Sequence, residues 1–266
     1  MKSDTPRPVY THGHHESVLR SHRWRTVENS AAYLLPHLKP GLLLLDVGCG
    51  PGSITADFAQ RLTPSRVCGL DSSSEIIDAA RRDHPGVEFA VGDVYDLAFD
   101  DASWDIVHAH QLLQHVSDPV AALKEMRRVV RPGGIVAARD SDYATFTWYP
   151  HDDRLKRWLD LYQEIARANG GEPNAGRHLL AWAREAGFSQ VQPSASSWCF
   201  ATPEERGWWG GLWADRITNS AIALQAQREH RARSEELASI ADAWRSWAVA
   251  PDGWFALIHG EVICIR

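Results

Sequence analysis

The sequence predicts an α/β fold in which helices cover both faces of a parallel β-sheet, and three observations carry this prediction. Residues 42–45 form an apolar run without polar alternation, which is typical of a strand buried on both faces. The run leads into a turn with glycines at every second position, within residues 48–52, and a helix begins directly afterwards. A second strand at residues 66–71 ends in Asp71, about 20 residues beyond the glycines, as in a βαβ unit that brings an acidic group to a ribose.

The chain before the first strand, residues 1–41, is predicted to be a helical segment. Its helix is expected over residues 17–35, because Glu16 favours a helix start and Pro36 a stop. Three histidines at positions 12, 14 and 15 precede this helix. They lie on a short segment and lack distant partners of a metal-binding type, so no metal site is predicted.

The rest of the chain divides into further strands and helices. Apolar residues at helical spacing indicate helices at residues 119–130 and 152–169, the first followed by an Arg-Pro-Gly-Gly stop. Strands are predicted at residues 87–93, 104–110, 135–140, 189–200 and 254–266. Asp140 ends the third of these, at the sheet edge where ligands of open α/β sheets bind, although a turn-forming role is the alternative for an aspartate there.

The glycine turn separates two classes of ligand. Dinucleotide enzymes use G-x-G-x-x-G, whereas this chain has Gly48-x-Gly50-x-Gly52 and carries Ser53 where the third dinucleotide glycine would stand. Asp46 lies just before the turn, where it would repel a pyrophosphate and suit a cationic ligand. The pattern therefore disfavours a nicotinamide-dependent oxidoreductase without excluding it.

On residues 45–52, LDVGCGPG, the chain resembles the class I S-adenosylmethionine-dependent methyltransferases, and the likeness extends in ordered motifs to residue 187. The branch it is most similar to is the quinone-biosynthesis type, which includes natural-product enzymes. The resemblance implies a Rossmann-like, seven-stranded, mostly parallel sheet with one reversed strand. It also implies S-adenosyl-L-methionine as cofactor and S-adenosyl-L-homocysteine as product.

The same resemblance, together with the loop and strand ends, designates site residues. The expected cofactor-binding residues are Tyr10, Asp46, Gly48, Gly50, Gly52, Asp71, Ser72, Asp93, Val94, His110 and Gln111. The helical segment is expected to fold over the cofactor, with His14 and Arg25 as further residues of that roof. The candidates for removing a proton from the acceptor are Asp140, Tyr143, His115 and His15. A packed histidine between helices remains the alternative for His115.

The remaining organisation is a single domain over residues 1–266. After the helical segment, residues 42–200 form the Rossmann-like core, residues 201–253 a helical cap insertion, and residues 254–266 the final strand. The cap is rich in tryptophan, and aromatic walls favour flat ligands. The expected acceptor is therefore a planar aromatic or heteroaromatic small molecule, such as an indole-containing metabolite, methylated at carbon or nitrogen, with oxygen less favoured. A quinone precursor methylated at carbon is one alternative; another is that the tryptophans are simply the core of the cap.

Composition restricts the partners and the compartment. A formal net charge of -6 gives no electrostatic footprint for nucleic acid, which argues against an RNA methyltransferase. No apolar run reaches the roughly 18 residues of a membrane span, and no signal peptide is visible, so a cytoplasmic protein is expected. The four cysteines lack C-x-x-C spacing, so neither a disulfide framework nor a metal site is expected. A non-catalytic cofactor-binding protein stays open, as does the oligomeric state, including a homodimer.

Overall fold

A computed structural model of the chain, which describes Thr11 and residues 15–266, contains a seven-stranded sheet with the order β3-β2-β1-β4-β5-β7-β6. The strands are β1 Leu44–Val47, β2 Val67–Asp71, β3 Glu88–Val91, β4 Trp104–His110, β5 Val130–Tyr149, β6 Gln190–Phe200 and β7 Trp254–Ile265. Neighbours from β3 to β5 pair in parallel, whereas β7 pairs antiparallel with both β5 and β6. The predicted mostly parallel sheet with one reversed strand is confirmed.

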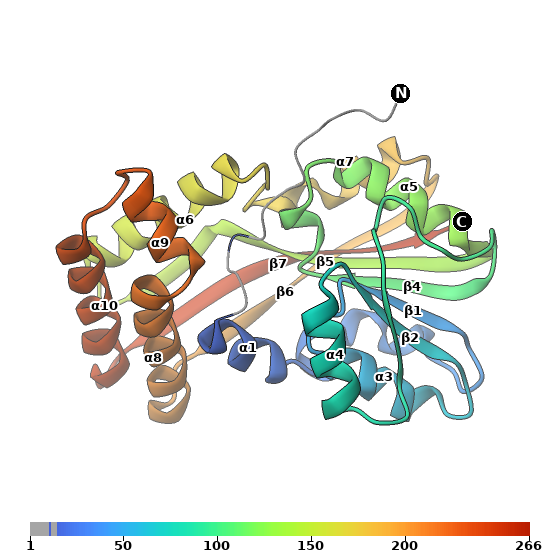
Figure 1. Ribbon diagram of the computed structural model, residues 1–266, viewed down its shortest axis with the longest axis horizontal. Helices are drawn as coiled ribbons and strands as arrows, with labels where there is room; N and C mark the ends of the chain where they lie inside the picture. Colours follow the sequence, from blue (N-terminus) through green and yellow to red (C-terminus); the bar gives the residue numbers. More distant parts are fainter. Residues whose placement is uncertain (1–10, 12–14) are drawn as a thin grey trace.

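Helices cover both faces of this sheet (Figure 1). One face carries α3 Ser53–Leu62 and α4 Ser74–Asp83, and the other carries α5 Pro119–Val129 and α7 Leu179–Glu185. Successive side chains of a strand point to opposite faces, so Leu44 of β1 joins the cluster around Phe58 of α3 while Leu45 joins the cluster around Met126 of α5. This two-sided burial explains why the strand before the glycine turn is apolar without alternation.

The segment before β1 is not the single helix expected over residues 17–35. It consists of α1 Glu16–Arg23, α2 Val27–Ser30 and the 3₁₀ helix η1 Ala32–His37. The break occurs because Thr26 takes an extended conformation and forms a capping box with Asn29, which starts a new helix. Trp24 and Arg25 therefore lie at a corner between two helices. That corner is what brings Arg25 to the carboxyl ends of the strands.

The strand expected at residues 135–140 extends much further, from Val130 to Tyr149, and takes in the Arg-Pro-Gly-Gly segment predicted as a helix stop. At its start, Val130 pairs with Trp104 of β4. Beyond Asp140 the reason is tertiary, because β7 pairs antiparallel with β5 from Ile135 to Asp142 and again from Thr147 to Tyr149. These pairs supply backbone hydrogen bonds to a segment whose local sequence does not demand a strand. Two short 3₁₀ helices lie elsewhere in the chain: η2 Leu113–His115 follows β4, and η3 Ala175–His178 precedes α7.

The long ends of β5, β6 and β7 carry a helical cap built from α6 Asp153–Ala168, α8 Pro203–Asn219, α9 Ala221–Arg228 and α10 Ser234–Val249 (Figure 1). Trp158, Trp213 and Trp244 are at most 1% exposed at its centre and meet in edge-to-face pairs with centroids 4.6 and 4.8 Å apart. Arg216 of α8 joins the cap to α1, since its Nη2 donates to the Ser17 carbonyl at 2.9 Å. Along the described residues, no helix combines the length and apolarity that crossing a membrane requires.

Candidate active site

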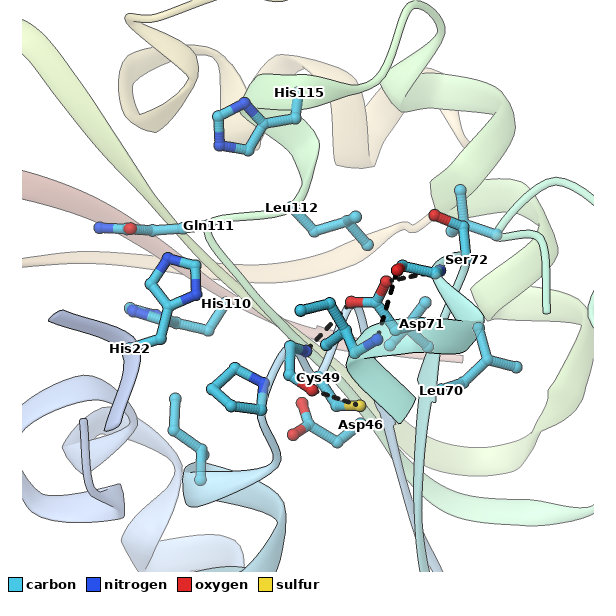
Figure 2. A pocket seen from close by; sticks show the side chains of 18 of the residues that line it. His22, Asp46, Cys49, Leu70, Asp71, Ser72, His110, Gln111, Leu112 and His115 are labelled. Carbon is cyan, nitrogen blue, oxygen red and sulfur yellow. Dashed lines mark hydrogen bonds between the residues drawn. The ribbon is translucent and has the colours of Figure 1, made fainter. Parts of the chain in front are cut away.

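A cavity of about 470 Å³ opens at the carboxyl ends of β1, β2 and β4, and α1 forms part of its wall. Ten of the predicted site residues line it: Asp46, Gly48, Gly50, Asp71, Ser72, Asp93, Val94, His110, Gln111 and His115. In Figure 2, Asp71 and Ser72 occupy one side, His22, His110 and Gln111 the opposite side, and Leu112 lies between them. The cavity therefore has two distinct ends, which we call the Asp71 end and the inner end (His22, Arg25, His110 and His115).

The three glycines of the turn have different tasks. Gly48 and Gly50 take positive φ angles of 72° and 55° and line the cavity. A Cβ on Gly50 would face His22 Nδ1 at 3.5 Å, so the glycine keeps this part of the wall clear. Gly52 does not line the cavity; a Cβ there would lie 2.6 Å from Phe89 Cζ, and its φ is 84°. The structure thus places Gly52 against Phe89 at the start of α3, outside the cavity lining.

Asp71 joins the glycine turn to the turn that follows β2. Its Oδ2 accepts the Gly50 N–H at 3.1 Å, and its Oδ1 accepts the Ser73 N–H at 3.0 Å. Each oxygen keeps a second lone pair for a ligand hydroxyl. The carboxylate thus lies at the position that a cofactor ribose requires in a βαβ unit.

Asp46 is 2% exposed, and the protein itself uses both of its oxygens. Oδ2 accepts from Thr55 Oγ1 at 2.6 Å, and Oδ1 lies 2.8 Å from Nδ1 of the fully buried His108. These contacts tie the end of β1 to α3 and β4. Asp46 therefore holds the glycine turn in place in addition to lining the cavity.

Two imidazoles form much of the inner end. His110 is 5% exposed, and neither ring nitrogen has a hydrogen-bond partner within the described part of the chain. Burial, with the charges of Arg25 and Arg139, lowers the pKa of His110 well below its usual range. Burial lowers the pKa of His115 to about 3. Both rings are therefore neutral at physiological pH. His115 Nε2 lies 3.0 Å from Gln114 Nε2, whereas the His110 ring has one donor and one acceptor nitrogen without partners among the described residues.

Gln111 lines the cavity, but its amide is held by protein groups on the far side. It takes a positive φ of 51°, its Oε1 accepts from Arg25 Nη2 at 2.5 Å, and its Nε2 donates to Ser141 Oγ at 2.8 Å. Nε2 also lies 3.0 Å from His259 Nε2. Figure 2 shows the side chain directed away from Asp71. Gln111 therefore connects the corner after α1 to β5 and β7.

Three of the proton-transfer candidates lie away from the cavity wall. Asp140 is fully buried, its Oδ1 accepts the Gln114 N–H at 3.1 Å, and burial raises its pKa to about 7. Tyr143 is stacked between Phe146 and Tyr162 with centroids 4.3 and 4.0 Å away, and burial raises its pKa.

His15 caps α1, its Nδ1 accepting the Ser17 N–H at 3.2 Å. Of the four candidates, the structure brings His115 alone to the described lining. The remaining roof residues Tyr10 and His14 lie outside the described residues.

Some lining residues were not expected from the sequence. His22 of α1 and Leu112 after β4 line the cavity, and Arg25 does so as expected. No local signal distinguishes His22 from the other leader histidines, because its place depends on how α1 packs on the cap. Conversely, no tryptophan is among the described lining residues; those of the cap form its core. Within the same described part, no cluster of three histidine, cysteine or acidic side chains could hold a metal ion.

Comparison with known proteins shows which family the sequence matches. Residues 45–138 match the model of the methyltransferase domain family. The chain is 34% identical over 279 residues to an uncharacterized methyltransferase of Schizosaccharomyces pombe, with 99% of this chain and 98% of that protein covered. It is 29% identical over 200 residues to the demethylmenaquinone methyltransferase of Beutenbergia cavernae, with 73% and 75% covered.

A solved structure shares the fold. Haemonchus contortus phosphoethanolamine N-methyltransferase 2, in complex with phosphomonomethylethanolamine and S-adenosylhomocysteine, has a TM-score of 0.56 to this chain at 18% identity. The match covers 90% of this chain and 53% of that one, so the chain spans about half of the solved structure. At 18% sequence identity, this similarity shows a shared fold and nothing about the substrate.

Proposed function

Because this chain belongs to the class I S-adenosylmethionine-dependent methyltransferases, we propose that it methylates a carbon or nitrogen atom of a small planar aromatic or heteroaromatic acceptor. The proposal rests on an observation at the inner end of the cavity. There a buried imidazole, His110, has two ring nitrogens without hydrogen-bond partners in the part of the chain that the structure describes. A buried polar group of this kind is stabilised when a ligand completes its hydrogen bonds.

The residues at the Asp71 end fit the cofactor, which supplies an electrophilic methyl group on a cationic sulfonium. We assign Asp71 to the ribose hydroxyls, because its carboxylate retains acceptor capacity at the strand end. Gly48 and Gly50 leave room for the methionine portion, and Asp93 with the Val94 backbone would face the adenine. The cofactor then runs from Asp71 toward His110.

At the inner end, the acceptor would lie against the imidazoles of His22 and His110, on whose faces a flat ring can stack (Figure 2). Its nucleophilic atom forms a bond to the methyl carbon while the carbon–sulfur bond breaks and leaves its electron pair on sulfur. A neutral acceptor also releases a proton. His110 is neutral, and its acceptor nitrogen can take a hydrogen bond from the O–H or N–H group that loses the proton.

Two alternatives to this function remain: a quinone precursor as acceptor, and a non-catalytic cofactor-binding role. The named activity of the Beutenbergia cavernae relative makes a quinone precursor methylated at ring carbon the second candidate acceptor. The absence of tryptophan from the described lining withdraws one argument for an indole-type ring, and flat stacking now depends on imidazoles. Family membership decides against the nicotinamide oxidoreductase, whereas a non-catalytic cofactor-binding protein is decided by turnover.

The test is methyl transfer from cofactor labelled in its methyl group to a panel of indoles, phenols, quinone precursors, aliphatic amines and aliphatic acids. Mass spectrometry of each product locates the added methyl. The proposal expects turnover among the aromatic members. Turnover confined to aliphatic acceptors would refute the aromatic assignment, and cofactor binding without any turnover, including in a metabolite extract, would favour a non-catalytic role.

A further inference from the structure

Asp46 is a buried carboxylate in the wall of the cavity, and two different elements supply its hydrogen bonds. It is 2% exposed and lines the cavity where β1 ends (Figure 2). Thr55 Oγ1 of α3 donates to its Oδ2 at 2.6 Å, and Nδ1 of His108, on β4, lies 2.8 Å from its Oδ1. Because a carboxylate only accepts hydrogen bonds, Nδ1 carries the proton in the second contact. Each oxygen is therefore fixed by a donor of its own.

The surroundings of His108 hold this imidazole in one orientation and keep it uncharged. Its Cα pairs with that of Asp46 across β4 and β1, so the two side chains leave neighbouring strands on the same face of the sheet. The ring is fully buried and forms an edge-to-face pair with Phe58, with centroids 5.0 Å apart. Its Nε2 has no hydrogen-bond partner in the part of the chain that the structure describes. A second proton there would leave a buried N–H unpaired, so the ring is neutral.

The negative charge of Asp46 is therefore oriented by its partners without being cancelled. Both donors, the Thr55 hydroxyl and the His108 imidazole, are neutral, and no arginine or lysine among the described residues forms an ion pair with Asp46. Asp71, the second carboxylate near the glycine turn, is likewise held by backbone N–H groups. A buried charge is costly unless an opposite charge accompanies it. This part of the wall thus suits a ligand that brings a positive group.

We propose that His108 and Thr55 are positioning residues for the cofactor, which hold the charged Asp46 carboxylate against the cationic methionine portion of S-adenosylmethionine. Each Asp46 oxygen keeps a second lone pair for this contact. The cofactor has two positive groups, the sulfonium and the ammonium, and attraction to either is stronger at a buried site than in water. The inference rests on the proposed methyl transfer only for the identity of the cofactor, and it does not depend on the acceptor.

A purely structural role for the same contacts predicts a different result. If His108 and Thr55 only anchored the glycine turn, their loss would displace Gly48 and Gly50 and would weaken every ligand that occupies the cofactor cavity. If they position the charge of Asp46, their loss weakens the ligands that carry a positive group and spares a neutral one. A neutral fragment of the cofactor therefore separates the two roles.

The test measures the binding of three ligands by calorimetry. S-adenosylmethionine carries the sulfonium and the ammonium, S-adenosylhomocysteine carries the ammonium alone, and 5′-methylthioadenosine carries neither. Thr55→Val keeps the shape of the side chain and removes the hydroxyl. It should weaken S-adenosylmethionine about 10-fold, within the range of one charge-assisted hydrogen bond, and change 5′-methylthioadenosine by less than about twofold. A larger loss for S-adenosylmethionine than for S-adenosylhomocysteine places the carboxylate at the sulfonium, and an equal loss places it at the ammonium.

Matched variants show whether the donor itself matters. Thr55→Ser keeps the hydroxyl, and His108→Asn keeps an N–H close to the position of Nδ1, so both should bind S-adenosylmethionine within about threefold of the wild type. His108→Phe keeps an aromatic ring without the donor and should resemble Thr55→Val. Thr218→Val removes a hydroxyl that donates to the Ala214 carbonyl within α8, at 3.0 Å, and should bind all three ligands as the wild type does.

A double-mutant cycle shows whether Thr55 acts through the charge of Asp46. Asp46→Asn removes the charge, keeps one acceptor oxygen, and should weaken S-adenosylmethionine at least as much as Thr55→Val does. In the Asp46→Asn background, Thr55→Val should not lower the preference for S-adenosylmethionine over 5′-methylthioadenosine any further, because two residues that share one interaction are not additive.

Three results would overturn the proposal. The first is a loss of equal size for all three ligands in Thr55→Val, which would assign its hydroxyl to the scaffold. The second is an unchanged affinity for S-adenosylmethionine in both Thr55→Val and His108→Phe. The third is the same effect of Thr55→Val with and without the Asp46 charge. Binding results as expected without methyl transfer to any aromatic acceptor would support this inference and count against the proposed acceptor alone.

Discussion

Replacement of Asp140 by asparagine should make the protein progressively more stable than the wild type as the pH rises. Asp140 is fully buried on β5; its Oδ1 accepts the Gln114 N–H, and its Oδ2 has no hydrogen-bond partner among the described residues. Burial raises the pKa of this carboxyl from 3.8 to about 7. Asparagine keeps the shape and the acceptor for Gln114 but does not ionise.

The direction of this pH dependence of stability follows from proton linkage. The folded protein holds this proton more tightly than the unfolded chain does, so the carboxyl lowers wild-type stability as the pH rises from about 4 to about 7. At about 1.4 kcal/mol per pH unit, the rise in pKa corresponds to about 4 kcal/mol, to order of magnitude. At acidic pH the variant should instead be about 1–3 kcal/mol less stable, because its buried amide N–H₂ lacks a partner.

The assay is urea unfolding, followed by far-UV circular dichroism, of wild type and variant at about pH 4.5, 6 and 8. The quantity of interest is the difference in unfolding free energy at each pH, in which the other titrating groups cancel. Asp242→Asn, at an exposed position of α10, controls for the loss of one carboxylate. A difference that stays constant within about 1 kcal/mol across this range would refute the assigned pKa and its desolvation cause.

Gly50→Val should block S-adenosylhomocysteine binding in calorimetry, because a branched side chain at φ 55° would fill the cavity wall; Gly41→Val, at φ 88° with no atoms within 4 Å, is the control for backbone strain. Asp71→Ala should weaken the same binding by about 1–3 kcal/mol, and unchanged affinity would remove the ribose assignment. Trp158→Ala should lower the free energy of unfolding by about 3–5 kcal/mol; its cofactor affinity should not change, since Trp158 belongs to the cap core.

Local chemistry determined the first half of the core. The unbroken apolar run before the glycine turn predicted β1. In the structure all four residues of that strand, Leu44–Val47, are buried. Helical spacing predicted α5 close to its observed bounds. Parallel strands end at one edge, so the glycine turn, Asp71 and His110 were predictably neighbours, and all line one cavity.

Other features depend on contacts between segments far apart in the sequence. The length of β5 follows from its pairing with β7, more than a hundred residues later, and the burial of Asp140 and Tyr143 follows from what packs over that strand. The same holds for the tryptophans, which are a core because four helices enclose them.

Sequence by itself thus determined most strands and helices of the core and the glycine turn at one edge of the sheet, where local periodicity, caps and turn residues act over a few positions. The tertiary structure decided the inner end of the cavity. Arg25 reaches it because Thr26 breaks the leader helix and Arg216 holds α1 against α8. A side chain's charge is visible in a sequence, whereas the field it meets depends on burial and on neighbours from distant segments, which only the folded chain brings together.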